Sequence, residues 1–123
     1  MNTTPTEAQE QTALFQWAAY MARKWPELRL MHAIPNGGSR HPVEAARLKA
    51  QGVKAGIPDI FLPVARGGYH GLYIEMKRKK GGRISVDQQQ MIDALRDQGY
   101  RVEVCKGAEE ASKTIKEYMK EGQ

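Results

Sequence analysis

Apolar residues at helical spacing predict a first helix over residues 5–24. The apolar stripe of this segment consists of Leu14, Trp17, Ala18, Met21 and Trp25. Thr4 is placed to cap this helix, and Pro5 suits its first position. Glu7 follows Thr4 by three residues, which is the spacing of a capping box. The two tryptophans are expected in the core, because large apolar residues on a helical stripe are usually buried.

The rest of the chain alternates between strand-like and helix-like segments. Strands are predicted over residues 28–34, 60–65, 71–77 and 100–105, and helices over residues 43–51, 85–99 and 108–119. Gly67-Gly68 lies between the second and third strands and predicts a turn, so these two strands can pair as a hairpin. The predicted order is α-β-α-β-β-α-β-α. It indicates an α/β fold, with a mixed β-sheet flanked by helices and the hairpin at its centre.

Acidic and basic side chains lie at the ends of the two hairpin strands. Pro58-Asp59 comes directly before one strand, and Glu75-Met76-Lys77 ends the next. Side chains alternate between the faces of a strand, so Glu75 and Lys77 share a face and Met76 points to the other. Pairing of the strands brings Asp59 close to Glu75. Two carboxylates and an ammonium at one edge of a sheet suit a divalent metal and an attacking water.

The alternative to a metal site is a solvated ion pair. A Glu-x-Lys pair on one strand face is common and contributes less than about 1 kcal/mol when exposed. The strand-end context favours the metal site, because a desolvated carboxylate without a partner is costly and a hard cation offsets that cost. The predicted ligands are then Asp59, Glu75 and the backbone carbonyl of Met76. Lys77 is expected beside the attacking water, where it either stabilises a hydroxide or acts electrostatically on the transition state.

Three further polar residues have both a functional and a structural interpretation. Glu7 is either a third acid of the metal site or the capping-box partner of Thr4. Glu10 is a second candidate for that acid, and Glu7, Glu10 and Gln11 all lie on or beside the buried face of the helix. Gln88 either contacts the water or substrate or only completes a second capping box with Ser85. The residues themselves leave these alternatives open.

The charge of the chain favours a polyanionic partner. The 123 residues include 19 Lys and Arg against 14 Asp and Glu, which gives a net charge of +5. The predicted nucleic-acid-binding residues are Arg40, Arg47, Lys49 and Lys54, with His41 beside them, and Arg78, Lys79, Lys80 and Arg83. Either group alone is typical of a solvated surface, but the two groups flank the acidic site and together indicate a phosphate channel. No aromatic-rich stretch suggests base stacking, so contacts to the DNA backbone are expected.

Other function classes are disfavoured by the sequence. A single cysteine, Cys105, permits no internal disulfide and suits a reducing cytosol, so a cytoplasmic location is expected. No apolar run is as long as a membrane span and the N-terminus lacks a signal-peptide pattern, so no membrane partner is expected. The three histidines do not have zinc-site spacing with Cys105, and residues 32–41 resemble an HNH nuclease only superficially. The length predicts one domain over residues 1–123.

The set of motifs resembles the PD-(D/E)xK nuclease superfamily and, within it, the stand-alone virus-type replication-repair nuclease (VRR-NUC) domains of phages and bacteria. The matching segments are Glu7 with Gln11, residues 34–38, residues 56–61, residues 73–77 and residues 85–88. They come in the family's order and cover nearly the whole chain. The resemblance implies a restriction-endonuclease-like core, dependence on Mg²⁺ or Mn²⁺, and hydrolysis that leaves a 5′-phosphate and a 3′-hydroxyl. It also favours catalytic roles for Glu7 and Gln88, because the family has site residues at these positions.

The resemblance further implies a homodimer that acts on branched DNA, such as four-way junctions or flaps. The expected function is a metal-dependent DNA endonuclease of replication, repair or recombination, without a small-molecule cofactor. Its expected catalytic residues are Glu7, Asp59, Glu75, Lys77 and Gln88. Two alternatives are a non-catalytic DNA-binding module with the same fold and a nuclease with a sequence-specific or RNA substrate.

Overall fold

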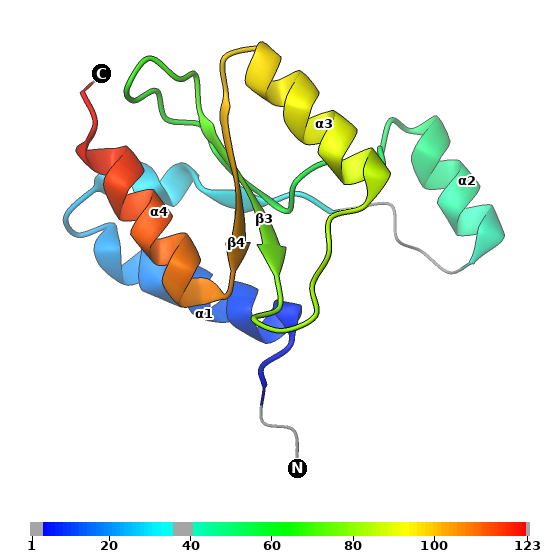
Figure 1. Cartoon of the computed structure of the whole chain (residues 1–123), viewed down its shortest axis with the longest axis horizontal. Helices are drawn as coiled ribbons and strands as arrows, with labels where there is room; N and C mark the ends of the chain where they lie inside the picture. The colour runs from blue at the N-terminus through cyan, green and yellow to red at the C-terminus, as the bar shows by residue number, and fades with distance from the viewer. Residues whose placement is uncertain (1–3, 36–40, 123) are drawn as a thin grey trace.

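The fold is a four-stranded mixed sheet flanked by helices, as predicted (Figure 1). The computed structural model describes residues 4–35 and 41–122. The elements are α1 (Glu7–Met21), the 3₁₀ helix η1 (Pro26–Leu30), β1 (His32–Ala33), α2 (Pro42–Ala50), β2 (Ile60–Leu62), β3 (Leu72–Lys77), α3 (Val86–Asp97), β4 (Arg101–Lys106) and α4 (Ala108–Lys120). The strand order is β1-β2-β3-β4. The β2–β3 hairpin therefore lies at the centre of the sheet, with β1 antiparallel to β2 and β4 parallel to β3.

One face of the sheet is covered by α1 and α4 (Figure 1). We call it the covered face; its central residues are Ile60, Leu62, Leu72, Ile74 and Met76, and all are buried. Leu14 and Ala18 of α1 pack against it, as do Ala111, Ile115 and Tyr118 of α4. Trp17, Met21 and Trp25 are only half-buried at the edge of this core, so the predicted stripe is confirmed with its tryptophans less deeply buried than expected.

The other face, which we call the open face, presents Phe61, Tyr73, Glu75 and Lys77, the residues that alternate with the covered ones. On this face α3 packs beside β4, where Ile92 and Val102 are both buried. Over β2 and β3 the rings of Phe61 and Tyr73 remain half-buried.

Two predicted segments of the N-terminal region, the first helix and the first strand, are wrong in detail. Helix α1 is capped by Thr6 rather than Thr4: the Thr6 hydroxyl accepts from the N–H of Gln9 at 3.1 Å, and the Gln9 side chain accepts from the N–H of Thr6 at 2.9 Å. The capping-box signature occurs twice here, two residues apart, and the second copy is the one that forms. Glu7 is therefore not a capping partner. The helix also ends at Met21 instead of residue 24.

The second correction concerns the predicted strand over residues 28–34. Its first part is the 3₁₀ helix η1, and only His32–Ala33 pairs with β2. Leu28 and Met31 are the buried residues of this segment, and their spacing of three positions matches a 3₁₀ helix rather than the alternation of a strand.

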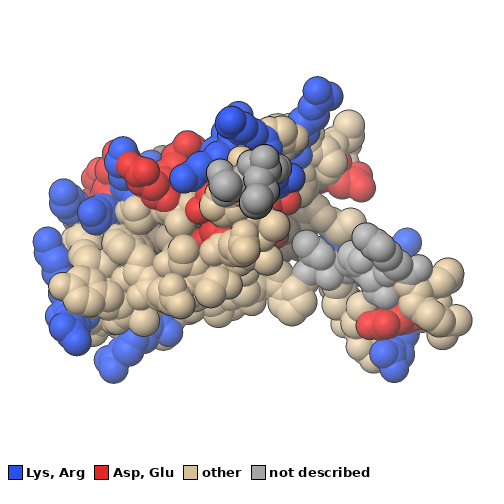
Figure 2. Space-filling model, turned by 90° about the horizontal axis from the view of Figure 1, so that it is seen from below, with Lys and Arg blue, Asp and Glu red and all other residues tan. Residues whose placement is uncertain are grey.

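Helix α2 stands away from the other elements in Figure 1, and the same lobe projects from the body in Figure 2. None of its residues is buried. No helix in the described part of the chain is long and apolar enough to cross a membrane.

Candidate active site

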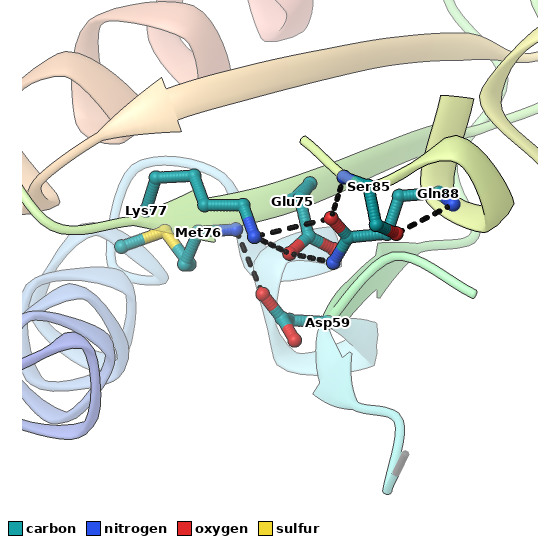
Figure 3. A network of polar contacts seen from close by, with 6 residues as sticks. All are labelled: Asp59, Glu75, Met76, Lys77, Ser85 and Gln88. Carbon is teal, nitrogen blue, oxygen red and sulfur yellow. Dashed lines mark hydrogen bonds and ion pairs between the residues drawn. The ribbon is translucent and has the colours of Figure 1, made fainter. Parts of the chain in front are cut away.

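The β2–β3 hairpin brings Asp59 and Glu75 together, as predicted. Ile60 pairs with Ile74, so one further step in this antiparallel register puts Asp59 opposite Glu75. Asp59 Oδ2 accepts a hydrogen bond of 2.8 Å from the backbone N–H of Met76 (Figure 3). The position of Asp59 is thus fixed by the neighbouring strand.

The sequence around Asp59 explains why its side chain, and not a backbone carbonyl, takes this N–H. Strand β2 begins only at Ile60, and the buried Pro58 precedes the acid. Met76 is therefore beyond the end of its backbone ladder with β2, and the Asp59 carboxylate replaces the missing partner. The N–H and C=O of an extended residue point to the same edge of a strand, so the Met76 carbonyl faces the Asp59 side.

Lys77, Gln88 and Glu75 form a closed set of contacts above β3 (Figure 3). Lys77 Nζ lies 3.3 Å from Glu75 Oε2 and donates to Gln88 Oε1 at 3.2 Å. Gln88 Nε2 in turn donates to Glu75 Oε2 at 3.0 Å. All three side chains come from the open face or from the first turn of α3, so the site depends on how α3 docks.

Gln88 also forms the second capping box that the sequence predicts. Its backbone N–H donates to Ser85 Oγ at 3.1 Å, and its side-chain Oε1 accepts from the N–H of Ser85 at 2.9 Å. The cap therefore does not prevent the Gln88 side chain from contacting Lys77 and Glu75 as well. The cap holds the amide in one orientation, with Oε1 toward the Lys77 ammonium and Nε2 toward the Glu75 carboxylate.

The carboxylate of Glu75 is in an unusual electrostatic environment. Burial, and after it the charge of Asp59, raises its pKa to about 7, and the Lys77 ammonium only partly opposes these effects. Only 3% of Glu75 is exposed. Two carboxylates thus face each other and, among the described residues, only one ammonium, that of Lys77, lies beside them. This arrangement favours uptake of a proton or a cation.

The donor atoms of this site fit a magnesium-type ion. Asp59, Glu75 and the Met76 carbonyl supply only oxygen, and no group of three or more His, Cys, Asp or Glu residues that could hold a metal occurs among residues 4–35 and 41–122. Two carboxylates are what Mg²⁺ usually takes from a protein, whereas zinc sites use nitrogen or sulfur ligands and calcium sites are richer in protein oxygens.

The two acids of α1 lie in different environments. Glu7 is exposed in the first turn. Glu10 is 6% exposed, and its Oε1 accepts from the N–H of Ala108 at 3.1 Å, at the start of α4. Its Oε2 is buried without a hydrogen-bond partner, 3.9 Å from Lys79 Nζ. Glu10 therefore faces the loop that follows β3, and the catalytic role of Glu7 stays a prediction.

The predicted nucleic-acid-binding residues fall into two separated groups. Lys79, Lys80 and Arg83 are exposed in the loop directly after Lys77, and Arg78 is half-buried there. Arg47 and Lys49 are exposed on α2, with Lys54 just beyond it, while Arg40 lies outside the described residues. Figure 2 shows Lys and Arg side chains gathered on one side of a small group of acidic side chains.

One residue of the site could not be identified from its own chemistry. A Cβ on Gly82 would lie 2.8 Å from the Cβ of Lys77, so only glycine lets the basic loop fold back against the lysine. No local pattern in the sequence connects Gly82 to Lys77.

Comparisons with known proteins identify the family to which the chain belongs. The VRR-NUC domain family model matches residues 6–109. A solved structure named "VRR_NUC domain protein" is 34% identical, with a TM-score of 0.85, and the match covers 99% of this chain and 94% of that one. A search of the curated proteins found no match. The family match spans most of the sequence and includes both acids, the lysine and the capping glutamine, and the chain belongs to the VRR-NUC family of nuclease-type domains.

Proposed function

We propose that the protein is a metal-dependent DNA endonuclease whose active centre is formed by Asp59, Glu75, Lys77 and Gln88. The observation that carries this proposal is the pair of facing carboxylates at the β2–β3 end, with Glu75 buried at a pKa of about 7 and a lysine 3.3 Å away. Perturbed titration of this kind, beside a specific charge partner, is typical of active sites. The VRR-NUC fold supports the same reaction class.

Each residue has a role that its contacts support. Asp59 and Glu75, with the Met76 carbonyl, would hold a Mg²⁺ or Mn²⁺ ion, which when bound supplies Lewis-acid activation of water and charge neutralisation at the phosphate. Asp59 Oδ2 accepts a hydrogen bond from the N–H of Met76, so the pairing of β2 with β3 fixes the orientation of its carboxylate. The Lys77 ammonium lies where it can stabilise the negative charge that develops on the attacked phosphate. Gln88 accepts from Lys77 through Oε1 and donates to Glu75 through Nε2, and so holds these two side chains in fixed relative positions.

The basic residues are proposed to hold the DNA backbone. Lys79, Lys80 and Arg83 follow the active centre directly along the chain and are exposed. Arg47, Lys49 and Lys54 are exposed in and just after α2, which projects from the body (Figure 2). Lysine and arginine bind phosphates largely without regard to base sequence. Because the two basic groups lie apart, they suit a substrate with DNA on both sides of the cleaved bond. We propose that this substrate is branched DNA and that a homodimer cuts it, as the family resemblance implies.

The test is cleavage of a labelled four-way junction beside a linear duplex of the same sequence. Wild type and Asp59→Asn are compared with Mg²⁺, with Mn²⁺ and with EDTA, and flaps, single-stranded DNA and RNA are added to the panel. Metal-dependent cutting of the junction that is lost in Asp59→Asn is the expected result. Equal cutting of the duplex would remove the branched-DNA preference and keep the chemistry. Tight binding without cutting under either metal would overturn the nuclease proposal in favour of a binding module.

A further inference from the structure

Five aromatic rings from separate parts of the chain meet on the open face. This aromatic row consists of His32, Phe61, Tyr73, Tyr100 and His70. Phe61 and Tyr73 are stacked with ring centroids 4.2 Å apart, and Tyr100 packs edge-on against Tyr73 at 5.3 Å. His32 and His70 extend the row at its two ends, each 5.8 Å from the next ring. The sequence has no aromatic-rich stretch, and the fold assembles one.

Two glycines make room for this row. A Cβ on Gly71 would lie 2.8 Å from Phe61 Cε1, and a Cβ on Gly99 would lie 2.7 Å from His70 Cδ2. Any larger residue would push these rings out of place. The close packing leaves three of the rings half-buried, those of Phe61, Tyr73 and Tyr100. Both histidines are exposed. The row is thus a fixed aromatic surface that is partly open to solvent.

The row is continuous with the candidate active site. Tyr73 precedes Glu75 by two residues on β3, and Phe61 follows Asp59 by two residues, so both rings share a face with the acids. Two strand residues span about 7 Å. This distance corresponds to about two base-pair rises along one DNA strand. A nucleic-acid strand that follows β3 with one phosphate at the carboxylates therefore has a nucleotide one or two positions away over the rings.

We infer that the aromatic row is a seat for one unpaired nucleobase within two nucleotides of the cleaved phosphate. This inference rests on the proposed nuclease function and adds the feature of the substrate that the site recognises. The rings offer apolar and π contact, in contrast to the lysines and arginines of the loop after β3. Every nucleobase has a π-face that can pack on aromatic rings, so the contact is tolerant of sequence. In a duplex both faces of a base are covered by its neighbours, so an unpaired base fits the row and a paired base does not.

The experiment combines a change in the DNA with a change in the protein. The substrate is a duplex with a single-stranded arm in which one abasic site is moved along the arm, nucleotide by nucleotide. The protein variants are Tyr73→Leu, which keeps apolar bulk, and His32→Ala at the exposed end of the row, which serves if Tyr73→Leu does not fold. Tyr20→Ala is the control, because Tyr20 is a 63% exposed tyrosine on α1, across the sheet from the row. Dissociation constants are measured in EDTA and cleavage rates with Mg²⁺.

In wild type and in Tyr20→Ala, we expect one or two abasic positions beside the cleaved bond to weaken binding by about 5- to 150-fold. In Tyr73→Leu or His32→Ala, the same abasic positions should have a clearly smaller effect, because the ring that held the base is already missing. Equal abasic effects in every variant, or none in wild type, would overturn the seat.

Two further outcomes distinguish the nucleobase seat from a protein interface and from the nuclease activity itself. If the row variants change the oligomeric state in sedimentation while base dependence is unaltered, the row is a protein interface and the inference is wrong. If wild type cuts no substrate but the base dependence of the dissociation constant follows the row, the nuclease proposal fails and the base seat stands.

Discussion

The two faces of the central sheet differ in what their side chains contribute. On the covered face Ile60, Leu62, Leu72 and Ile74 are completely buried and apolar, and they pack against α1 and α4. On the open face the same strands carry Glu75 and Lys77, which are 3% and 9% exposed and charged. The covered face thus gains stability from apolar burial. The open face buries charge that is only partly compensated.

This difference indicates that the hairpin is stabilised from one side and carries the candidate active site on the other. A buried carboxylate with a raised pKa lowers the stability of the folded state whenever it is ionised. The apolar packing of the covered face offsets this loss of stability and holds β2 and β3 in register. Substitutions on the two faces should therefore separate activity from stability.

The largest expected effect is on cleavage, from single changes at the open-face site. Asp59→Asn, Glu75→Gln and Lys77→Ala should each lower the cleavage rate by about 10²-fold or more, because each removes a charge that acts on the reacting phosphate or its ion. DNA affinity should change little, and each variant should stay folded at the assay temperature. The measurement is single-turnover cleavage with saturating Mg²⁺. Wild-type turnover in any one purified variant would remove that residue from the mechanism.

On the covered face the expected effect is on stability. Ile74→Ala should lower the free energy of unfolding by about 2–5 kcal/mol, because the side chain is 0% exposed and leaves a cavity under α1 and α4. Its neighbour Tyr73 points to the open face, and Tyr73→Leu should cost less, about 1–3 kcal/mol, because it loses the ring pairs with Phe61 and Tyr100 but keeps apolar bulk. Denaturant unfolding of both variants gives the comparison. Equal losses in the two variants would mean that both faces of the sheet contribute equally to the free energy of unfolding.

The basic loop after β3 should control affinity rather than chemistry. Changing Lys79, Lys80 and Arg83 to alanine together should weaken DNA binding and reduce the slope of log K against log salt by about 2–3, if each contacts one phosphate. Cleavage at saturating protein should be largely retained. An unchanged salt slope in the triple variant would argue that the DNA backbone does not run along this loop.

The raised pKa of Glu75 predicts a particular dependence of stability on pH. Between the ordinary value of 4.5 and about 7, the folded protein binds more protons than the unfolded chain, so the free energy of unfolding falls as pH rises through this window and is level above it. In EDTA, Glu75→Gln should abolish this fall, which amounts to at most about 3 kcal/mol. Asp59→Asn should only reduce it, because burial is the larger cause. Adding Mg²⁺ should stabilise wild type more at pH 8 than at pH 5, and a pH profile unchanged by Glu75→Gln would contradict this account.

The sequence was sufficient to predict the elements that depend on a periodic pattern or on a local turn. Alternation along residues 60–62 and 72–77 reflects a real difference between two faces, so the hairpin and its buried residues could be predicted. The turn at Gly67-Gly68 is confirmed, with positive φ at both glycines and a bridge between Arg66 and Tyr69. The closeness of Asp59 and Glu75 followed from the pairing of those strands.

What the sequence did not show depends on contacts between distant segments. Glu10 is buried because α1 docks against the loop after β3 and the start of α4, and no local pattern distinguishes it from the exposed Glu7. The aromatic row gathers rings from β1, β2, β3 and two loops, none of which is aromatic-rich alone. The cap of α1 lies two residues later than predicted, because the sequence contains two overlapping capping-box signatures and the second one forms.

The smallest expected effect comes from the two capping boxes, which are alike in geometry and differ in what they support. Ser85→Ala and Thr6→Ala each remove a hydroxyl that accepts an N–H at 3.1 Å, so each should cost about 0.5–2 kcal/mol of stability. Only the Ser85 box contains Gln88, whose side chain contacts both Lys77 and Glu75. Ser85→Ala should therefore also slow cleavage severalfold, because the amide loses its fixed orientation, whereas Thr6→Ala should leave the rate unchanged at a temperature where both variants are folded. Equal rates in the two variants would mean that contacts with Lys77 and Glu75 alone orient Gln88 and that the cap serves only the helix.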